Sequence, residues 1–415
     1  MRRVVVTGLG TISAQGLNTA EFWQSLCAGA SGIRPIEGFA ADRLSVKVAA
    51  QVRGYDPAAH FEQKQLDLLD RFSQFALVAA REALADAVLE ISGAIGRETA
   101  VVLGTGVGGK TTEDEAFHQL YAQGQQRFSP FLIPRLMANA ATSHITMEFG
   151  ITGPGLAVST ACAASTHAIG LAAGWLRGGI AEVALAGGSE APLSLGSLKA
   201  WEGVRVLAPD TCRPFSRDRK GMVLAEGAGV MVLETEERAR ARGARIYAEL
   251  AGFGMSSDAG HITQPSQEGA ARAMEAALRD ATLSTADIGY VNAHGTGTTA
   301  NDLTETLAIH QVFGDDAKRL AVSSTKSMHG HAMGASGALE TIATVLALSE
   351  GILPPTANFL GPGDGCDLDY VPNSAREARA AAALSNSFAF GGLNAVLCLR
   401  RWEDGGRRRF PTSGS

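Results

Sequence analysis

Two stretches of the sequence, LAVSTAC (156–162) and LAVSSTK (320–326), echo one another, and each leads into an alanine- and glycine-rich helical segment. Two further pairs follow in the same order: VVLGTG (101–106) with YVNAHGTG (290–297), and GAGVMVLE (227–234) with GGLNAVLCL (391–399). Short β-branched runs alternate with alanine-rich stretches throughout, which is typical of α/β proteins with buried strands. One echo could arise by chance, but three in the same order predict two similar α/β halves packed as one body.

The echoes divide the chain into a first half over residues 1–243 and a second half over residues 244–402. Extra loops are predicted in the first half, mainly at 110–150 and 194–220. The tail 403–415, EDGGRRRFPTSGS, is polar and glycine-rich and is expected to be disordered. Its arginine run is read as solvated rather than as a binding patch.

Composition excludes several classes of partner. The 415 residues carry 36 Lys and Arg against 42 Asp and Glu, a net charge of −6, which argues against a nucleic-acid or anionic-membrane surface. No stretch approaches the roughly 18 uninterrupted apolar residues of a membrane helix. Five cysteines lack paired spacing, and MRRVVVTGLG reads as a strand rather than a signal peptide. These features predict a soluble protein of the reducing cytoplasm.

Local patterns locate three helices and the first strand. A strand begins at Val4, and Asn18 with Glu21 gives a capping-box signal for a helix that ends near Gly29. A second amphipathic helix is predicted over 71–88. The segment 162–177 is small and apolar on nearly every face, so we expect a helix buried at the centre of the molecule.

The glycine loop GTGVGGKT (104–111) matches both the phosphate-loop pattern and a dinucleotide-binding pattern. A nucleotide site also needs an acidic residue that closes an apolar strand or ends the next strand. Neither is evident, since the strand EVALAGGSE ends in Gly-Gly-Ser. We therefore favour a glycine turn that lets the backbone approach a site, and keep nucleotide binding as the alternative.

Cys162 is distinguished by its position, directly after a strand and at the start of the apolar helix. Free N–H groups and the positive helix end predict a lowered thiol pKa there. The alternative is a small buried hydrophobe, which is the better reading of an isolated cysteine. The other cysteines offer no such setting, and Cys398 reads as core.

Further polar groups follow apolar strands in the second half: His294, Lys326, His329 and His331. A buried histidine is more often a core residue than a catalyst, and one cysteine with three histidines could form a zinc set. Metal ligands, however, usually cluster at short fixed spacing. The duplication places Cys162 and Lys326 at equivalent strand ends, and the turns at Gly104 and His294 are equivalent too. Convergence on one site would set a cysteine nucleophile opposite two histidines.

Four separated motifs, STACAAST, NAHGTGT, SSTKSMHGH and SNSFAFGG, together resemble the elongating β-ketoacyl-acyl-carrier-protein synthases of the thiolase fold, closest to the type II branch. The resemblance runs in order from about residue 2 to residue 401. It implies two pseudo-symmetric halves in α-β-α-β-α layers, usually as a homodimer. It implies neither a metal nor a redox cofactor, because the substrates are carried on the phosphopantetheine of an acyl carrier protein.

The resemblance implies a ping-pong reaction. Cys162 would take an acyl group from one carrier, with the oxyanion held by the N–H groups of Cys162 and Phe390. Neutral His294 and His331 would then donate to the thioester oxygen of malonyl-carrier as CO2 leaves, and the carbanion would extend the acyl chain by two carbons. Lys326 would orient His331 or organise charge with Glu305.

Other family positions carry over one by one. Thr296 and Thr298 match positions that hold the pantetheine amides, and Phe390 matches the gate of the acyl pocket, near Val107 of the glycine loop. Acidic positions that support the site are matched by Asp302, Glu305 and Glu340.

Two departures from the family pattern concern the carrier and the site. Where type II relatives are rich in Lys and Arg that dock the carrier, KQLDLLD (64–70) keeps only Lys64, with Arg205 as a second contact. His329 replaces a smaller or non-titrating residue and would add a base near the site. With STACAAST and DTCRPFSRD (210–218), these features resemble synthases for specialised acyl chains, such as the nodulation type. Chain length, saturation and the identity of the carrier stay open.

Two rival members of the same fold are disfavoured. A biosynthetic thiolase should carry a reactive cysteine near its C-terminus in a glycine-rich CxG context, which Cys398 in AVLCLR lacks. A non-catalytic chain-length partner typically lacks the nucleophile, whereas Cys162 is present. Pairing with a second, related subunit stays open beside the homodimer.

Overall fold

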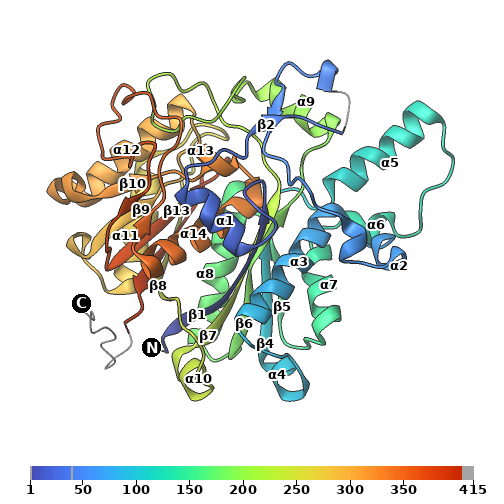
Figure 1. Cartoon of the computed structure of the whole chain (residues 1–415), viewed down its shortest axis with the longest axis horizontal. Coiled ribbons are helices and arrows are strands. Elements are labelled where there is room, and N and C mark those ends of the chain that lie inside the picture. Colours follow the sequence, from blue (N-terminus) through green and yellow to red (C-terminus); the bar gives the residue numbers. More distant parts are fainter. Residues whose placement is uncertain (1, 39–40, 404–415) are drawn as a thin grey trace, which may run out of the picture.

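The structure is a computed structural model that describes residues 2–38 and 41–403 (Figure 1). From residue 404 on, the tail expected to be disordered lies outside the described residues. Within the described ranges, ten strands form one mixed sheet in the order β10-β9-β13-β14-β8-β1-β7-β6-β4-β5. Their bounds are β1 Val4–Ser13, β4 Thr99–Gly104, β5 Gly155–Val158, β6 Val183–Glu190, β7 Gly227–Thr235, β8 Ala248–Ser257, β9 Ile288–Asn292, β10 Ala321–Ser323, β13 Ala382–Phe388 and β14 Leu393–Arg401.

The sheet is palindromic about its centre. Strands β5-β4-β6-β7-β1 are mirrored in order by β10-β9-β13-β14-β8, and the two sets meet where β1 and β8 pair antiparallel. Directions match as well, since β4 is parallel to β5 and β6 just as β9 is parallel to β10 and β13. The three sequence echoes fall on β5 and β10, β4 and β9, and β7 and β14. The duplication predicted from the sequence is therefore confirmed. The predicted boundary after residue 243 falls between α10 and β8.

Five long helices complete a layered arrangement: α3 Arg71–Asp86, α8 Ala164–Arg177, α11 Gln267–Ala281, α12 Thr299–Phe313 and α14 Ser336–Glu350. Helices α8 and α14 pack on one another and on strands of both halves, so they form the middle layer (Figure 1). Helix α3 covers β1, β7 and β6, while α11 covers β8 and β14 and packs against α12. The order of layers is α-β-α-β-α, as the resemblance implied.

Apart from the 14-residue helix α5, the remaining helices and strands have ten residues or fewer. They are α1 Thr19–Cys27, α2 Gln63–Leu66, α4 Gly93–Glu98, α5 Lys110–Gln123, α6 Leu132–Leu136, α7 Ala140–Phe149, α9 Leu195–Val204, α10 Glu236–Ala241, α13 Lys326–His329, and the strands β2 Arg34–Pro35, β3 Val48–Ala49, β11 Ile352–Leu353 and β12 Arg376–Glu377. No helix in the described part of the chain is both long and apolar enough to cross a membrane.

The local predictions are confirmed with small shifts of boundary. The side chain of Asn18 accepts from the N–H of Glu21 at 2.9 Å and caps α1, which ends at Cys27 rather than near Gly29. The helix predicted over 71–88 is α3. The segment 162–177 begins as a one-turn 3-10 helix, Ala161–Ala163, before α8 follows.

Helix α8 can lie between the two halves of the sheet because most of its side chains are small. A Cβ at Gly170 would lie 2.3 Å from the ring of Phe253, so only glycine lets α8 approach β8 this closely. Cys162 follows β5 and Lys326 follows β10, while His294 follows β9 and Phe390 follows β13. The equivalent strand ends of the two halves thereby bring these four residues to one region.

Candidate active site

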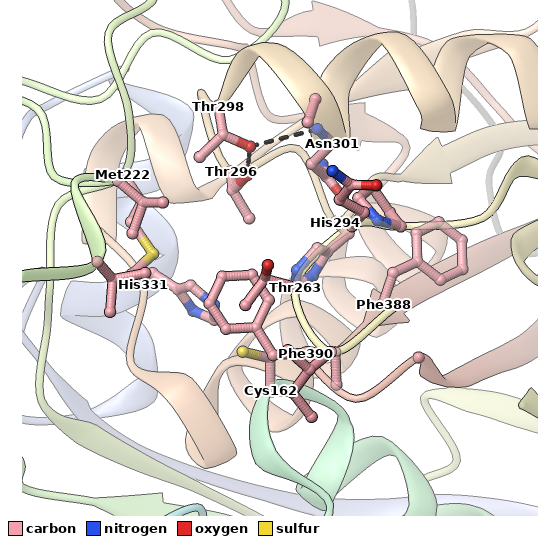
Figure 2. Close-up of a pocket in the computed structure, with 18 of the residues that line it drawn as sticks. Cys162, Met222, Thr263, His294, Thr296, Thr298, Asn301, His331, Phe388 and Phe390 are labelled. Carbon is pink, nitrogen blue, oxygen red and sulfur yellow. Dashed lines mark hydrogen bonds between the residues drawn. The ribbon is translucent and has the colours of Figure 1, made fainter. Parts of the chain in front are cut away.

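One pocket of about 170 Å³ opens where these strand ends meet (Figure 2). Both halves contribute to its wall, and Cys162, His294 and His331 lie on it together with Phe390. The other residues that line it are Trp201, Val204, Val206, Met222, Ile262, Thr263, Gln264, Pro265, Thr296, Thr298, Ala300, Asn301, Phe388, Ala389 and Gly392. Cys162 and His294, 132 positions apart in the sequence, thus share one cavity.

Cys162 lies at the base of the pocket, in the 3-10 turn that precedes α8. The residue before it, Ala161, has φ +48°, a left-handed conformation that an alanine adopts only where its surroundings enforce it. The N–H groups of Phe390 and of Cys162 itself are directed at the sulfur and lower the pKa of the thiol, as does the charge of Lys326. Burial outweighs these effects and raises the pKa of Cys162 to about 11.

The lowered thiol pKa expected from the helix start is therefore wrong for the free protein. Cys162 is only 7% exposed, so a thiolate there would be poorly hydrated. This loss of hydration raises the pKa by more than the helix start and the two N–H groups lower it. Cys162 of the free chain is consequently a thiol at neutral pH.

His294 is held by Lys326. The Lys326 Nζ lies 3.3 Å from Nδ1 of His294 and 2.7 Å from its carbonyl oxygen. An ammonium can only donate, so Nδ1 of His294 is an acceptor and the ring proton is on Nε2. Burial, with Lys326 and His331 nearby, lowers the pKa of His294 well below its usual value. The ring is therefore a neutral donor.

His331 meets His294 edge to face, with ring centroids 5.4 Å apart and planes at 85°. Its Nδ1 is 2.8 Å from the hydroxyl of Ser336, at the start of α14, so the other nitrogen is available to the pocket. Burial and the charge of Lys326 lower the pKa of His331 well below its usual value. Two neutral imidazoles thus line the same wall, next to Cys162.

The ion-pair partner of Lys326 is Glu340 on α14, and the charge of the ammonium also opposes the effect of burial on the pKa of Glu305. Both side chains are fully buried. The three donors of Lys326 are satisfied by Glu340 and by two atoms of His294, so the lysine orients His294 rather than His331. Burial raises the pKa of Glu340, while the neighbouring ammonium opposes that shift.

Asp302 and Glu305 lie on one buried face of α12 and hold the backbone of the loop that carries His294. Glu305 accepts from the N–H groups of His294 at 2.9 Å and Gly295 at 2.8 Å. Asp302 accepts from Gly297 N–H at 3.2 Å. Burial raises the pKa of both acids, that of Asp302 to about 6. Neither carboxylate lines the pocket, so both support the loop from behind.

Polar and aromatic side chains form the outer part of the pocket. The hydroxyls of Thr296 and Thr298 lie 2.9 Å apart, and Thr298 also caps α12 (Figure 2). The Phe390 ring is 6.0 Å from the ring of Trp201 on α9. Hydroxyls on one wall and aromatic rings on another suit a ligand with amide groups and an apolar end.

Four residues singled out from the sequence lie outside this cluster. Val107 is 41% exposed and does not line the pocket of this chain. Lys64 is exposed on α2, and Arg205 is exposed just after α9, between the lining residues Val204 and Val206. His329 does not line the pocket, although it lies near enough to His331 for its charge to lower the pKa of that ring. The Nε2 of His329 contacts Thr325 and its ring lies against Phe22, with a pKa lowered to about 3 by burial.

The glycine loop contacts an acidic residue after all. Glu190, the last residue of β6, accepts from the N–H groups of Gly106 at 2.5 Å and Val107 at 3.2 Å. Strand β6 ends at Glu190, directly after Gly-Gly-Ser, so the expectation that no acidic residue closes this strand is wrong. A carboxylate of the chain itself therefore occupies donors that would otherwise face a phosphate. Among the residues described, no group of three or more His, Cys, Asp and Glu is arranged to hold a metal.

Sequence reasoning missed several residues of the site, including Trp201, Met222, Asn301 and Ser336. Asn301 lies three residues after the motif NAHGTGT, and Ser336 lies five residues after His331, so a search for helix starts could have found both. Trp201 comes from the inserted loop 194–220 and Met222 lies just after it, and neither has a counterpart in the echoes. No signal in one sequence places such loops against a pocket.

Comparison with known proteins follows the same division into halves. The sequence family described as "Beta-ketoacyl synthase, N-terminal domain" matches residues 1–239, and "Beta-ketoacyl synthase, C-terminal domain" matches residues 247–360. Together the two matches cover most of the chain.

Whole-chain relatives agree with these matches. The chain is 48% identical over 400 residues to Nodulation protein E of Rhizobium leguminosarum bv. trifolii, covering 96% of this chain and 99% of the relative. It is 43% identical over 411 residues to 3-oxoacyl-[acyl-carrier-protein] synthase 2 of Coxiella burnetii (strain RSA 493 / Nine Mile phase I), covering 96% and 99%. Among solved structures, "The ishigamide ketosynthase/chain length factor" matches with a TM-score of 0.93 and 39% identity, covering 97% of this chain and 100% of that chain.

Proposed function

This chain belongs to the beta-ketoacyl synthase family and is a condensing acyltransferase of the thiolase-like fold, and from that premise we propose that Cys162, His294 and His331 carry out its reaction. One observation carries the proposal. A thiol that faces two N–H groups shares a pocket with two neutral histidines, of which His294 carries its ring proton on Nε2. Each group has a task in the joining of a thioester-bound acyl chain to a malonyl unit.

In the first half-reaction Cys162 takes the acyl group. The sulfur attacks the carbonyl carbon of the acyl thioester, and the N–H groups of Cys162 and Phe390 hold the oxyanion of the tetrahedral intermediate. Collapse breaks the bond to the carrier thiol, which leaves with the proton that Cys162 gives up. Because burial raises the pKa of Cys162 to about 11, the sulfur is a thiol in the free chain and must lose its proton as it attacks.

In the second half-reaction the histidines act on malonyl thioester. The Nε2–H of His294 and the free nitrogen of His331 donate to the thioester oxygen, which becomes an enolate as the carbon–carboxylate bond breaks and CO2 leaves. The carbanion forms a bond to the acyl carbon and displaces Cys162, whose sulfur takes up a proton. The product is a 3-oxoacyl thioester that is two carbons longer, and no electron donor or acceptor is consumed.

The carrier of both substrates is proposed to be an acyl carrier protein, as the printed name of the Coxiella relative has it for that protein. Thr296 and Thr298 offer hydroxyls to the amides of a phosphopantetheine arm. Arg205, exposed at the mouth of the pocket, is the proposed contact for an acidic carrier, with Lys64 on α2 as a second. Val107 is proposed to meet the acyl chain only where a second subunit covers it.

A second subunit is proposed because one sheet edge is left open. Strand β5 ends the sheet, and its Leu156 is 38% exposed. Phe131 and Ile133, around the start of α6, are 43% and 59% exposed. An edge strand presents unpaired N–H and C=O groups, which offer a template for pairing with another chain. We propose a homodimer, and light scattering of the purified chain, alone and as Ile133→Glu, tests it. A related partner subunit is the other outcome.

The substrate is proposed to be a specialised acyl chain of the nodulation type, because relatives named Nodulation protein E are 46–48% identical to this chain. Preference for ordinary saturated chains on the housekeeping carrier would contradict this subtype. We also propose a cytoplasmic location, which the five unpaired cysteines support.

Intact-mass spectrometry tests the proposed chemistry directly. The chain is incubated with acyl-carrier donors of graded length, and malonyl-carrier is then added. We expect a gain of one acyl group that is lost in Cys162→Ala, and a product two carbons longer. Cys27→Ser is the matched control, because Cys27 is the half-buried cysteine most open to side reactions. Equal labelling of wild type and Cys162→Ala would overturn the assignment of the nucleophile.

A further inference from the structure

Glu190 is a buried carboxylate that the proposed chemistry does not use. It ends β6 and is 0% exposed. One oxygen accepts from the Thr105 hydroxyl at 2.9 Å and from Val107 N–H at 3.2 Å. The other accepts from Gly106 N–H at 2.5 Å and from Gly334 N–H at 2.9 Å. Three of these donors belong to the glycine loop, and the fourth belongs to the segment that follows His331.

Burial raises the pKa of Glu190 to about 7, and the four donors oppose that shift because they favour the ionised form of the acid. A carboxylate is an acceptor on both oxygens, whereas an amide would turn an N–H₂ group toward donors. The surroundings are built around this group. A Cβ at Gly106 would lie 2.8 Å from Glu190 Oε2, and a Cβ at Gly334 would lie 2.3 Å from the backbone nitrogen of Gly106. Glycine at both positions allows the two segments to close around one carboxylate.

On one side, Glu190 holds the segment that positions His331. Gly334 follows Met333, whose φ of +44° is strained for a side chain of that size. Two residues later Ser336 contacts Nδ1 of His331 at 2.8 Å and so fixes the direction of the ring. The hydrogen bond from Gly334 N–H to Glu190 therefore holds the turn between His331 and Ser336, and with it the contact between these two residues.

On the other side, Glu190 holds the loop next to Cys162. Thr105 N–H donates to the carbonyl of Val158 at 3.0 Å, and the Ser159 hydroxyl donates to the carbonyl of Gly106 at 3.4 Å. Val158 and Ser159 lead directly into the turn that carries Cys162. The segment before the nucleophile and the segment after the histidine are thus joined through a single side chain.

We propose that Glu190 is a positioning residue that fixes the separation between the segment before Cys162 and the segment after His331. This inference rests on the proposed function, because it assigns the two segments to the two half-reactions. Acylation needs only the Cys162 side, whereas condensation needs both sides in register. Loss of Glu190 should therefore impair condensation far more than acylation.

The test compares Glu190→Gln with Glu82→Gln. Glu82 is a matched control, because it also accepts from two backbone N–H groups, of Thr11 at 2.8 Å and Thr19 at 2.7 Å, but lies away from the pocket. Acylation is followed by intact mass and condensation by product release. For Glu190→Gln we expect condensation to fall by about 100-fold, the cost of roughly 1 Å of misplacement, and acylation to fall by about threefold or less. Glu82→Gln should change the rates of acylation and condensation by the same factor.

Equal factors for both rates in Glu190→Gln would overturn the inference. Failure of the wild-type chain to load or condense would instead contradict the proposed function, so the two failures are distinguishable. If Glu190→Gln does not fold, Thr105→Val and Thr105→Ser serve, since only the serine keeps the hydroxyl donor. We expect the ratio of condensation to acylation to fall by about fivefold or more in Thr105→Val and to be retained in Thr105→Ser. Equal ratios in these two variants would also overturn the inference.

Discussion

The ammonium of Lys326 donates twice to His294, at 2.7 Å to its carbonyl oxygen and at 3.3 Å to its Nδ1. The third donor is directed at Glu340. One side chain thereby fixes the position of the histidine backbone and the tautomer of its ring. Because the ammonium also lies near His331 and Cys162, it helps to keep both imidazoles neutral and opposes the effect of burial on the thiol.

Removal of one partner of the buried ion pair between Lys326 and Glu340 should strongly destabilise the protein. In Lys326→Met the Glu340 carboxylate stays buried without a cation, and we expect the free energy of unfolding to fall by about 3–5 kcal/mol. The double variant Lys326→Met, Glu340→Gln should recover part of that loss. Urea unfolding measures both, with Lys318→Met, at an exposed surface pair, as the control. Equal losses in Lys326→Met and Lys318→Met would contradict the burial argument.

The two site histidines should not titrate in the physiological range. Because burial lowers the pKa of His294 and His331 well below the usual ~6.5, both rings should stay neutral from pH 8 down to 5.5. In the protein labelled at histidine Cε1, we expect the two NMR signals that vanish in His294→Asn and His331→Asn to keep their shifts over this range. A midpoint near 6.5 for either signal would contradict the expectation.

The same pKa shifts predict a sign for stability. As pH falls below about 6.5, the unfolded chain binds protons at these two positions and the folded chain does not, so folding loses free energy. The double variant His294→Asn, His331→Asn should therefore lose less stability than the wild type between pH 7 and pH 5.5. Urea unfolding at each pH measures the free energy of unfolding of both proteins. The contribution of buried carboxyls is common to both and cancels in the difference.

The fold could be predicted because duplication leaves its trace in the sequence. The echo of LAVSTAC and LAVSSTK corresponds to β5 and β10 at opposite ends of one palindromic sheet. Because the strand ends of the two halves are equivalent, the sequence alone predicted that Cys162, His294 and Lys326 lie close together. The apolar character of 162–177 correctly placed α8 in the middle layer, because a helix covered by both halves has no polar face to keep.

Environments were harder to predict than positions. The start of a helix suggested a lowered thiol pKa for Cys162, but the pKa depends on how much water the folded chain leaves around the sulfur. The resemblance implied that Lys326 orients His331 or organises charge with Glu305, whereas its hydrogen bonds go to His294 and to Glu340 on α14. Glu190 was missed because its partners are backbone N–H groups of a distant loop, and backbone donors leave no mark in the sequence.

The two threonines at the pocket should affect binding more than chemistry. Thr296→Val and Thr298→Val remove hydroxyls that we expect to meet the carrier arm in the ground state and the transition state alike. Each should raise the KM for malonyl-carrier by about three- to tenfold, the worth of one hydrogen bond, and leave kcat nearly unchanged. Steady-state condensation assays measure the split. Thr298→Ser is the control, because it keeps the hydroxyl both for the carrier arm and for the N-terminal cap of α12. A fall in kcat alone would place the threonines in the chemical step instead.

The reactivity of Cys162 tests the argument about its environment. Because burial raises the pKa of the thiol to about 11, the thiolate fraction should rise about tenfold per pH unit between pH 7 and pH 10. Alkylation by iodoacetamide, followed at the Cys162 peptide by mass spectrometry, should rise accordingly without a plateau. The peptide that contains Cys27 serves as an internal reference, since its thiol pKa is also raised to about 11, but without the two N–H groups. Lys326→Met should slow the reaction of Cys162 and leave that of Cys27 unchanged, because the ammonium lowers only the first pKa. A plateau below pH 8 would mean that the helix start and the N–H groups outweigh burial after all, and that the enzyme holds a preformed thiolate.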